Sequence, residues 1–201
     1  MNFGELLTEF YANGFDYLSD GGAGETRAKR FINQSYQELC AYDDWPFLEA
    51  TATGTAPLTV SDMRKPLYVV DTANFNRTLW EVDQATLTDG ADLTATGGWP
   101  HYYYLTGGTT VNIYPTATDS LTVRYIKTPT DLSADTDTPV VPAPYHDIIV
   151  LGAVRRALLD DTDGASIALI KQEWQDRLAT MLPAVMNPIS NQFVGGHSGD
   201  W

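Results

Sequence analysis

The first 45 residues of the chain repeat apolar side chains at the spacing of an α-helix. This pattern predicts one helix that starts at Asn2 or Phe3 and ends at Gly14, since glycine readily adopts the positive φ of a helix C-terminus. A second helix is predicted from Glu25 to about Tyr42, with charged and amide side chains mostly on its other side. Its apolar positions are Ala28, Phe31, Ile32, Tyr36, Leu39 and Cys40.

After Pro46 the pattern changes to short alternating runs separated by turn residues, which is typical of β-strands. Gly107-Gly108 lies between two of these runs and predicts a tight hairpin. Trp80, Trp99 and the run Tyr102–Tyr104 are expected to supply the large side chains of a small β core. The predicted strands are Leu48–Thr53, Leu58–Val60, Pro66–Val70, Thr78–Val82, His101–Leu105, Thr109–Tyr114 and Leu121–Lys127.

The chain returns to a helical pattern after an acidic, proline-containing loop at residues 128–141, which is expected to be solvated. Pro142, Pro144 and Asp147 mark a helix N-terminus, because proline is tolerated in the first turn and a carboxylate is favourable at the positive end of the helix dipole. The helix that follows is strongly apolar. We therefore expect it to lie at the centre of the fold.

The last part of the chain predicts one more helix and an extended tail. The helix runs from Ala165 to about Leu182, and Pro183 is expected to end it. Its side chains expected to face the other helices are Leu169, Trp174, Leu178 and Met181. A disordered tail is usually polar throughout. This tail instead carries isolated apolar residues, which is typical of a segment that docks in a partner's groove: Ile189, Phe193, Val194 and Trp201.

Together these segments predict an α+β fold. About four helices form a core, into which an antiparallel β-sandwich or barrel-like subdomain is inserted, and an extended C-terminal tail follows. The expected boundaries are residues 1–47 for the N-terminal helices, 48–130 for the β subdomain, 131–183 for the C-terminal helices and 184–201 for the docking tail.

The net charge of the chain limits the kinds of partner that it is expected to bind. The chain has 201 residues, with 12 Lys and Arg against 26 Asp and Glu, for a formal net charge of −14. This balance disfavours a protein that wraps nucleic acid, because neutralising phosphates requires clustered cations. An acidic surface can still line a conduit for DNA without binding it. The simpler alternative is that the charge keeps the chain soluble.

The remaining composition indicates a soluble, intracellular protein. Cys40 is the only cysteine, so no disulfide can form within the chain, and its place on an apolar stripe predicts burial. The N-terminal segment lacks the basic and long apolar regions of a signal peptide. No apolar run approaches the roughly 20 residues that a membrane span requires, so no membrane contact is expected.

No residue pattern indicates catalysis, a cofactor or a metal. The histidines have no cysteine or second histidine at metal-ligand spacing, and His101 and His146 are expected to be structural. No phosphate-binding loop and no G-x-S-x-G motif is present in the sequence. Arg155 and Arg156 are candidates for contacts with an acidic neighbour, a partner protein or DNA. An isolated arginine pair is also common on the solvated face of a helix.

Five segments occur in an informative order, although none is a strict signature by itself. A helix ending in Trp-Pro is followed by a β insertion and then by a helix that starts Pro-x-Pro-Tyr-His-Asp. In this order the chain, from about residue 24 to 182, resembles the head–tail connector adaptors of tailed bacteriophages, which attach beneath the portal ring. The segments are RAKRFINQSYQELCAYDDWPFLE, YYYLTGGTTVNIYP, LTVRYIKTPTDLS, DTPVVPAPYHDIIVLGAVRRALLDDTD and QEWQDRLATML.

The resemblance implies a structural virion protein rather than an enzyme. Such adaptors have a helical core with an inserted β domain and form a ring, usually dodecameric, beneath the portal. Their C-terminal segment commonly reaches along the portal, which agrees with the apolar residues of the tail here. The implied partners are the portal protein, other copies of the chain, a downstream tail protein and double-stranded DNA that passes without specific binding. The implied location is the head–tail interface of the virion, after assembly in the host cytoplasm.

Two other readings of the sequence stay open. The β subdomain could belong to a tail-associated binding module that recognises a carbohydrate or a protein, with Trp99 and Tyr102–Tyr104 as an aromatic platform. An acid-dependent hydrolase would need two positioned carboxylates, which a sequence with this many acids does not exclude. A large ring would indicate the adaptor, whereas a trimer or monomer would favour the binding module.

Overall fold

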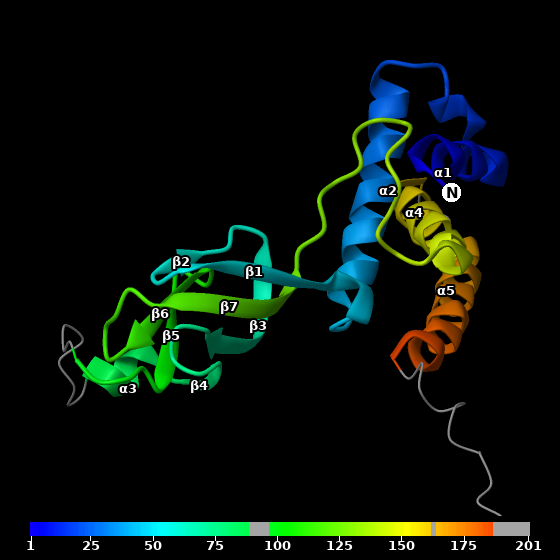
Figure 1. Ribbon diagram of the computed structural model, residues 1–201. Helices are drawn as coiled ribbons and strands as arrows, with labels where there is room; N and C mark the ends of the chain where they lie inside the picture. Colours follow the sequence, from blue (N-terminus) through cyan, green and yellow to red (C-terminus); the bar gives the residue numbers. More distant parts are fainter. Residues whose placement is uncertain (89–96, 162–163, 187–201) are drawn as a thin grey trace, which may run out of the picture. The chain divides into compact units, whose positions relative to one another are not determined.

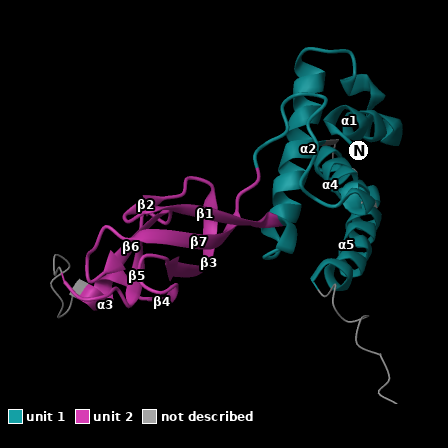
Figure 2. Ribbon diagram, in the orientation of Figure 1, with its two compact units in different colours: residues 1–47, 130–201 teal, residues 48–129 magenta. Residues whose placement is uncertain are grey.

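The chain folds as two compact units in a computed structural model that describes residues 1–88, 97–161 and 164–186. The first, here called the helical unit, comprises residues 1–47 and 130–201, and the second, the β unit, comprises residues 48–129 (Figure 2). The β unit is therefore an insertion between two helical parts of the sequence. The predicted α+β fold class, a helical core with an inserted β subdomain, is confirmed.

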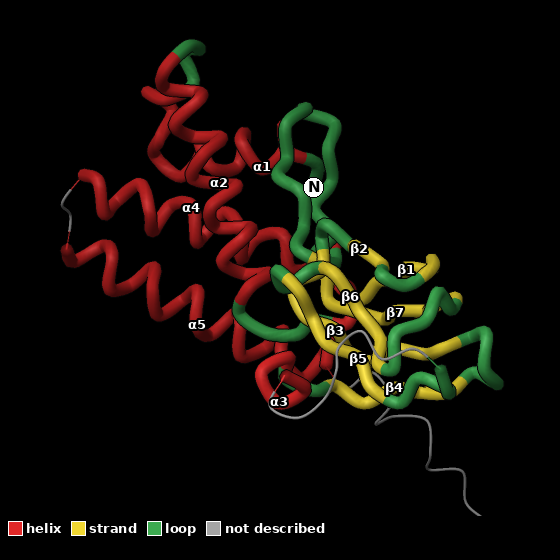
Figure 3. The backbone as a smooth tube through the Cα atoms, turned by 90° about the vertical axis from the view of Figure 1, so that its left-hand side faces the viewer, coloured by secondary structure: helices red, strands yellow, loops and turns green. Residues whose placement is uncertain are grey.

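The helical unit is built around its third long helix. Its helices are α1 (Phe3–Phe10), α2 (Ala23–Ala41), α4 (His146–Asp161) and α5 (Gly164–Met186) (Figure 1). A π-helical turn (Tyr11–Phe15) and a 3-10 turn (Asp16–Leu18) join α1 to α2. The helix α4 contacts α1, α2 and α5, and Figure 3 shows it running beside α5. The prediction of a central apolar helix is thus correct.

The first helix begins where its sequence predicts, but α1 ends at Phe10, and a π-helical turn carries the chain past the predicted end at Gly14. The side chain of Asn2 accepts a hydrogen bond from the backbone of Glu5 at 2.8 Å, and the Glu5 carboxylate accepts one from the Asn2 backbone at 2.9 Å. This capping box satisfies two backbone donors that the first turn leaves open. Gly14 has a φ of +97°, which turns the chain toward α2.

The helices α2 and α4 approach each other most closely at Ser35 and Gly152. The Ser35 hydroxyl donates to the Ile149 carbonyl at 2.7 Å, and Ser35 is buried. A Cβ atom added at Gly152 would lie 2.1 Å from Ser35 Oγ and 3.1 Å from Ser35 Cβ. Only glycine therefore fits at this crossing, because any side chain would separate the two helices.

The acidic loop before α4 is exposed in part, as expected, but the helices also hold it in place. The side chain of Asn33 bonds both the backbone N–H and the carbonyl of Leu132, each at 2.8 Å. The backbone of α1 donates to the carbonyls of Asp135 and Asp137. The Asp137 carboxylate accepts hydrogen bonds from Ser133 and Ala134, which lower its pKa. This loop thus fastens the two sequence parts of the helical unit together.

Two expectations for the last helix are wrong. The helix α5 continues through Pro183 to Met186, because the fixed φ of proline is itself helical and less than one further turn follows it. Leu169 is 71 % exposed, whereas Trp174, Leu178 and Met181 are buried as predicted. The predicted extended tail at 184–201 begins inside this helix, and residues 187–201 lie outside the described part of the chain.

The β unit is a seven-stranded, nearly closed, barrel-like sheet with the strand order β1-β7-β3-β4-β5-β6-β2. All seven predicted strands are present, with ends shifted by a few residues. Most neighbours are antiparallel, but β4 and β5 are parallel, with Trp80 opposite Tyr102 and Glu81 opposite Tyr103. The purely antiparallel expectation is therefore wrong at this pair. The strands are Glu49–Thr55, Leu58–Thr59, Met63–Asp71, Arg77–Glu81, Tyr102–Thr106, Thr110–Tyr114 and Ser120–Lys127, and α3 is Gln84–Thr88.

The core of the β unit consists mainly of aliphatic side chains from the inward positions of the strands. Of the aromatic residues predicted to fill it, Tyr103 is buried, while Trp80, Trp99 and Tyr102 are exposed. The hairpin between β5 and β6 turns at Gly107 and Gly108, both with positive φ, as predicted. The buried cluster is Ala56, Val60, Met63, Val69, Leu79, Tyr103, Val111, Ile113, Leu121, Val123 and Tyr125.

His146 is buried at the start of α4. Its Nε2 donates to the Val141 carbonyl at 2.7 Å, and its Nδ1 lies 2.7 Å from the backbone nitrogen of Met1. Burial lowers the pKa of this imidazole, and the positive charge of the Met1 amine lowers it further, while its hydrogen bonds and Asp147 act in the opposite direction. The folded protein therefore holds His146 neutral.

We expect the free energy of unfolding to fall as the pH is lowered below ~6.5, the ordinary pKa of histidine, because the pKa of His146 is lowered in the folded protein. Between the ordinary and the lowered pKa the unfolded chain binds a proton that the folded protein resists, so the loss is at most about 1.4 kcal/mol per pH unit. Urea unfolding of the wild type and of His146→Gln at several pH values measures it. The variant should be less stable at pH 7.5 and show a shallower slope; equal slopes would contradict this account.

Candidate interaction surfaces

The described residues contain no arrangement that indicates catalysis. They include no cluster of three or more His, Cys, Asp or Glu side chains that could hold a metal ion. His101 is exposed in the β unit, with Nδ1 donating to the Trp99 carbonyl at 2.6 Å and Nε2 accepting from Arg77 at 3.1 Å. His146 is buried in the helical unit, and His197 lies outside the described residues. None of the helices in the described ranges has the length and hydropathy of a membrane span.

The β unit instead presents an aromatic surface along the seam between β4 and β5. The exposed fraction is 88 % for Phe75, 73 % for Trp80, 56 % for Trp99 and 43 % for Tyr102, and these four residues are here called the aromatic patch. Trp80 and Tyr102 are opposite each other in the parallel pair, and the Phe75 and Trp99 rings meet edge-on at 5.9 Å. Exposed apolar patches of this kind mark surfaces that bind other molecules, and Trp, Tyr and Phe are enriched in protein interfaces.

The turn that carries Phe75 is held in a strained conformation. Phe75 and Asn76 have φ values of 59° and 54°, which are uncommon for residues other than glycine and cost free energy for a bulky side chain. The buried Asp71 carboxylate supports the turn by accepting from the backbones of Ala73 and Asn74 and from the Asn74 side chain. The hydrogen bonds of Asp71 therefore stabilise a turn that exposes the Phe75 side chain to solvent.

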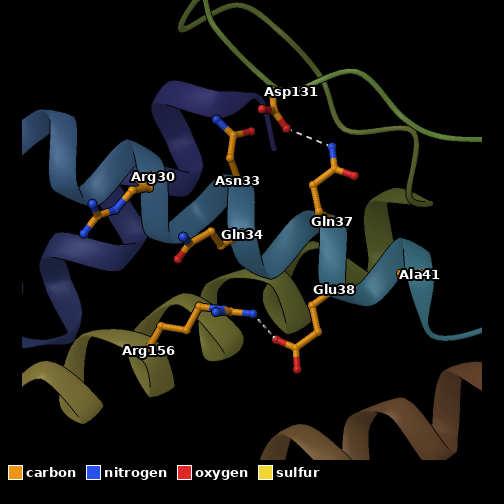
Figure 4. Close-up of a pocket in the computed structure, with 8 residues that line it drawn as sticks. All are labelled: Arg30, Asn33, Gln34, Gln37, Glu38, Ala41, Asp131 and Arg156. Atoms are coloured by element: carbon orange, nitrogen blue, oxygen red, sulfur yellow. Dashed lines mark hydrogen bonds and ion pairs between the residues drawn. The ribbon is translucent and has the colours of Figure 1, made fainter. Parts of the chain in front are cut away.

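The helical unit has a shallow groove along α2, lined mainly by residues with charged or amide side chains, with a volume of about 660 Å³. Figure 4 shows most of its side chains projecting from α2, with Asp131 on one side, where it accepts from Gln37, and Arg156 of α4 on the other. The lining mixes charges and amides, which suits a protein or peptide more than an apolar small molecule. The groove is lined by Arg30, Asn33, Gln34, Gln37, Glu38, Ala41, Asp131 and Arg156.

Glu38 forms ion pairs with two arginines at one end of this groove. It accepts from Arg155 at 2.5 and 2.6 Å and from Arg156 at 2.8 Å. Burial by itself would raise the pKa of Glu38, but the hydrogen bonds and charges of the two arginines bring it below its ordinary value. Arg155 also lies over the Trp174 ring at 5.0 Å and is only 14 % exposed. The three charges thus join α2 and α4 as well as shaping the groove.

The arginine pair predicted from the sequence to make contacts lies in the described part of the chain, and the predicted docking residues of the tail do not. Arg155 and Arg156 come together on Glu38, and Arg156 keeps part of its surface in the groove. Their contact with a portal subunit, another copy or DNA stays a prediction. The tail residues lie outside the described part of the chain: Ile189, Phe193, Val194 and Trp201.

Sequence reasoning missed Phe75 and the groove on α2. The signal for Phe75 was its position between Asn74 and Asn76, since asparagine is the residue besides glycine that best tolerates positive φ and turn conformations. The groove had no comparable signal. It depends on Asp131 and Arg156, which are far from α2 in the sequence.

The chain thus consists of a helical unit and an inserted β unit, each with an exposed surface of a kind found in protein contacts. The chain belongs to the family described as SU10 adaptor protein, whose sequence profile it matches over residues 1–192. It is therefore a phage adaptor protein, and the resemblance inferred from the order of its segments is confirmed. Adaptors of this family are structural proteins of the phage particle and are not known as enzymes. No curated protein matches the chain.

Proposed function

We propose that the protein forms a ring beneath the phage portal, connects the portal to the tail, and continues the channel through which DNA leaves the head. The observation that carries the proposal is the membership of the chain in the SU10 adaptor family. The groove of the helical unit and the aromatic patch of the β unit support it, because a ring that joins two other proteins needs surfaces for neighbouring copies as well as for a partner. The net charge of −14 supports a channel wall that repels phosphates, so DNA slides past it.

We further propose that residues 187–201 dock on the portal. Apolar residues separated by glycine and serine suit an extended segment that orders on its partner, and this ordering offsets part of the contact energy. The aromatic patch then belongs to the contact with the downstream tail protein, because aromatic side chains dominate the free energy of such interfaces.

Deleting residues 187–201 should leave a folded protein that sediments with the portal at least tenfold less than the wild type does. Co-sedimentation with purified portal measures this, and circular dichroism checks the fold. The matched control is a full-length chain in which Ile189, Phe193, Val194 and Trp201 are replaced by serine. This variant should bind the portal as weakly as the deletion does, because the proposed binding depends on the apolar side chains of the tail and not on its length. Undiminished portal binding by either variant would contradict the docking role.

A second candidate function is favoured by the aromatic patch alone. Exposed tryptophans can also stack on sugar rings, so the β unit could recognise a carbohydrate, or a protein other than a tail component, as part of a tail-associated binding module. A glycan array probed with the wild type and with Trp80→Ala separates the two functions. Specific glycan binding lost in the variant would favour the binding module.

A further inference from the structure

The helical unit has an acidic side on which the Met1 amine, 3.9 Å from the Glu5 carboxylate, is the cation among the described residues 1–26. Residues 1–26 include no lysine or arginine. Their exposed carboxylates lie on α1 and in the turns that follow it, and Tyr17, in one of these turns, is 53 % exposed. This surface is here called the acidic face and consists of Glu5, Glu9, Asp16, Tyr17 and Asp20.

Three arginines of the same unit line the groove or a hollow beside it. Arg30 lines the groove, and also lines a second hollow of about 510 Å³ that continues toward the start of α2, where Arg27 is exposed to it. Arg156 lines the first hollow from α4. No residue of the acidic face is among those that line either hollow, so the two surfaces are distinct.

The carboxylates near the groove are already occupied. Glu38 is shared by Arg155 and Arg156, and Arg27 pairs with Asp160 at 2.8 Å. Asp131 accepts from Gln37 at 2.8 Å. Within the described residues, Arg30 has no ion-pair partner, and the charged residues that line the two hollows are three arginines, Arg27, Arg30 and Arg156, against two carboxylates, Glu38 and Asp131. The two hollows together therefore carry one more positive than negative charge, in a chain whose formal net charge is −14.

We infer that the groove binds the acidic face of a second copy of this chain. The inference rests on the proposed ring, since a closed ring requires contacts between two different surfaces of identical subunits. Complementary charges set the orientation of such contacts and exclude wrong ones. Carboxylates of α1 and its turn face Arg30 and Arg156 in the neighbouring copy, and Tyr17 supplies an aromatic anchor of the kind that is enriched in interface hot spots.

DNA is a less suitable occupant of the groove. Its phosphates would approach Glu38 and Asp131 as well as the arginines. Binding of a duplex requires several cations with no competing carboxylates between them. A neighbouring copy can place its carboxylates at Arg30 and Arg156 alone, and its neutral side chains against the amides of Gln34 and Gln37.

Charge reversal tests the inference on the full-length chain. Mass photometry and sedimentation velocity measure ring formation by the wild type, Arg30→Glu, Glu9→Arg and the double variant, each alone and with purified portal. Both single variants should weaken self-association at least tenfold, and the double variant should recover to within about threefold of the wild type because the attraction is restored with its signs exchanged. Lys171→Glu makes the same charge change on an exposed position of α5 outside the groove and should assemble normally.

The possible results distinguish the proposed interface from the proposed ring and from DNA binding. A wild type that forms rings while Arg30→Glu and Glu9→Arg assemble equally well would overturn the inference and leave the proposed ring intact. A wild type that neither self-associates nor loads onto the portal would overturn the ring and this interface with it. Loss of binding to a 30-base-pair duplex in Arg30→Glu, with self-association unchanged, would assign the groove to DNA instead. Circular dichroism of each variant confirms that these exposed substitutions leave the fold intact.

Discussion

Replacing Gly152 by valine is expected to lower the free energy of unfolding of the helical unit by about 3 kcal/mol or more. A Cβ atom at this position would lie 2.1 Å from Ser35 Oγ, 3.1 Å from Ser35 Cβ and 3.3 Å from Trp174 Nε1. Overpacking of a core costs about 1–3 kcal/mol, and displacing the buried Ser35 hydroxyl from the Ile149 carbonyl adds about 1 kcal/mol. Thermal and urea unfolding followed by circular dichroism measure the loss.

A swap of the two small residues provides the control for this contact. Gly152→Ala alone should cost about 1–2 kcal/mol, since the better helix propensity of alanine offsets part of the overlap. Ser35→Gly combined with Gly152→Ala moves the missing side chain to the opposite helix, and it should be more stable than the sum of the two single changes predicts. Additive effects, or a valine variant as stable as the wild type, would contradict the close approach of α2 and α4.

Replacing Asp71 by alanine is expected to destabilise the β unit by about 3 kcal/mol. The buried carboxylate accepts hydrogen bonds from Ala73 N at 3.0 Å, Asn74 N at 3.2 Å and Asn74 Nδ2 at 2.7 Å, and Asn74 Nδ2 also donates to Asp119 at 2.7 Å. Removing the acceptor leaves donors unsatisfied and frees a turn whose φ values are unfavourable. Urea unfolding followed by far-UV circular dichroism at wavelengths dominated by β structure measures the change.

Asp71→Asn is the matched variant for the turn. It keeps the size of the side chain and one oxygen for the two backbone donors, but its amide group opposes that of Asn74, so the expected loss is about half that of alanine. Phe75→Gly should relieve the unfavourable backbone conformation at this position and stabilise the β unit slightly, while removing an aromatic residue from the patch. A Phe75→Gly protein less stable than the wild type would show that Phe75 packs in the β unit and is not held out for a partner.

Local patterns predicted the elements of this fold, and the relations between distant segments were harder to predict. The alternation of Val111 with Ile113 and the glycine pair at 107 and 108 identify the β5–β6 hairpin because each signal lies within a few residues. The parallel pairing of β4 with β5 has no local signal, since it depends on the path of the 20 residues from Val82 to His101 that separate the two strands. Strand position was therefore predictable from the sequence, and strand order was not.

The candidate surfaces, like the strand order, depend on relations between distant segments that local sequence patterns do not reveal. Alternation shows that Tyr102 and Tyr103 point to opposite faces of a strand, but it does not show which face is the core, and the aromatic patch results from that choice. The Arg155–Arg156 pair was visible in the sequence, whereas its partner Glu38 lies more than a hundred residues away. The adaptor family was recognisable because the order of helices, insertion and helix start survives without any single strict motif.

Mass photometry of the purified protein mixed with its portal tests the central claim most directly. If the protein is a connector adaptor, the portal should gain the mass of a closed ring of these chains, about one per portal subunit, and negative-stain images should show the added ring on a single end of the portal. Chains that stay monomeric or trimeric in the presence of the portal, with no mass added to it, would contradict the account.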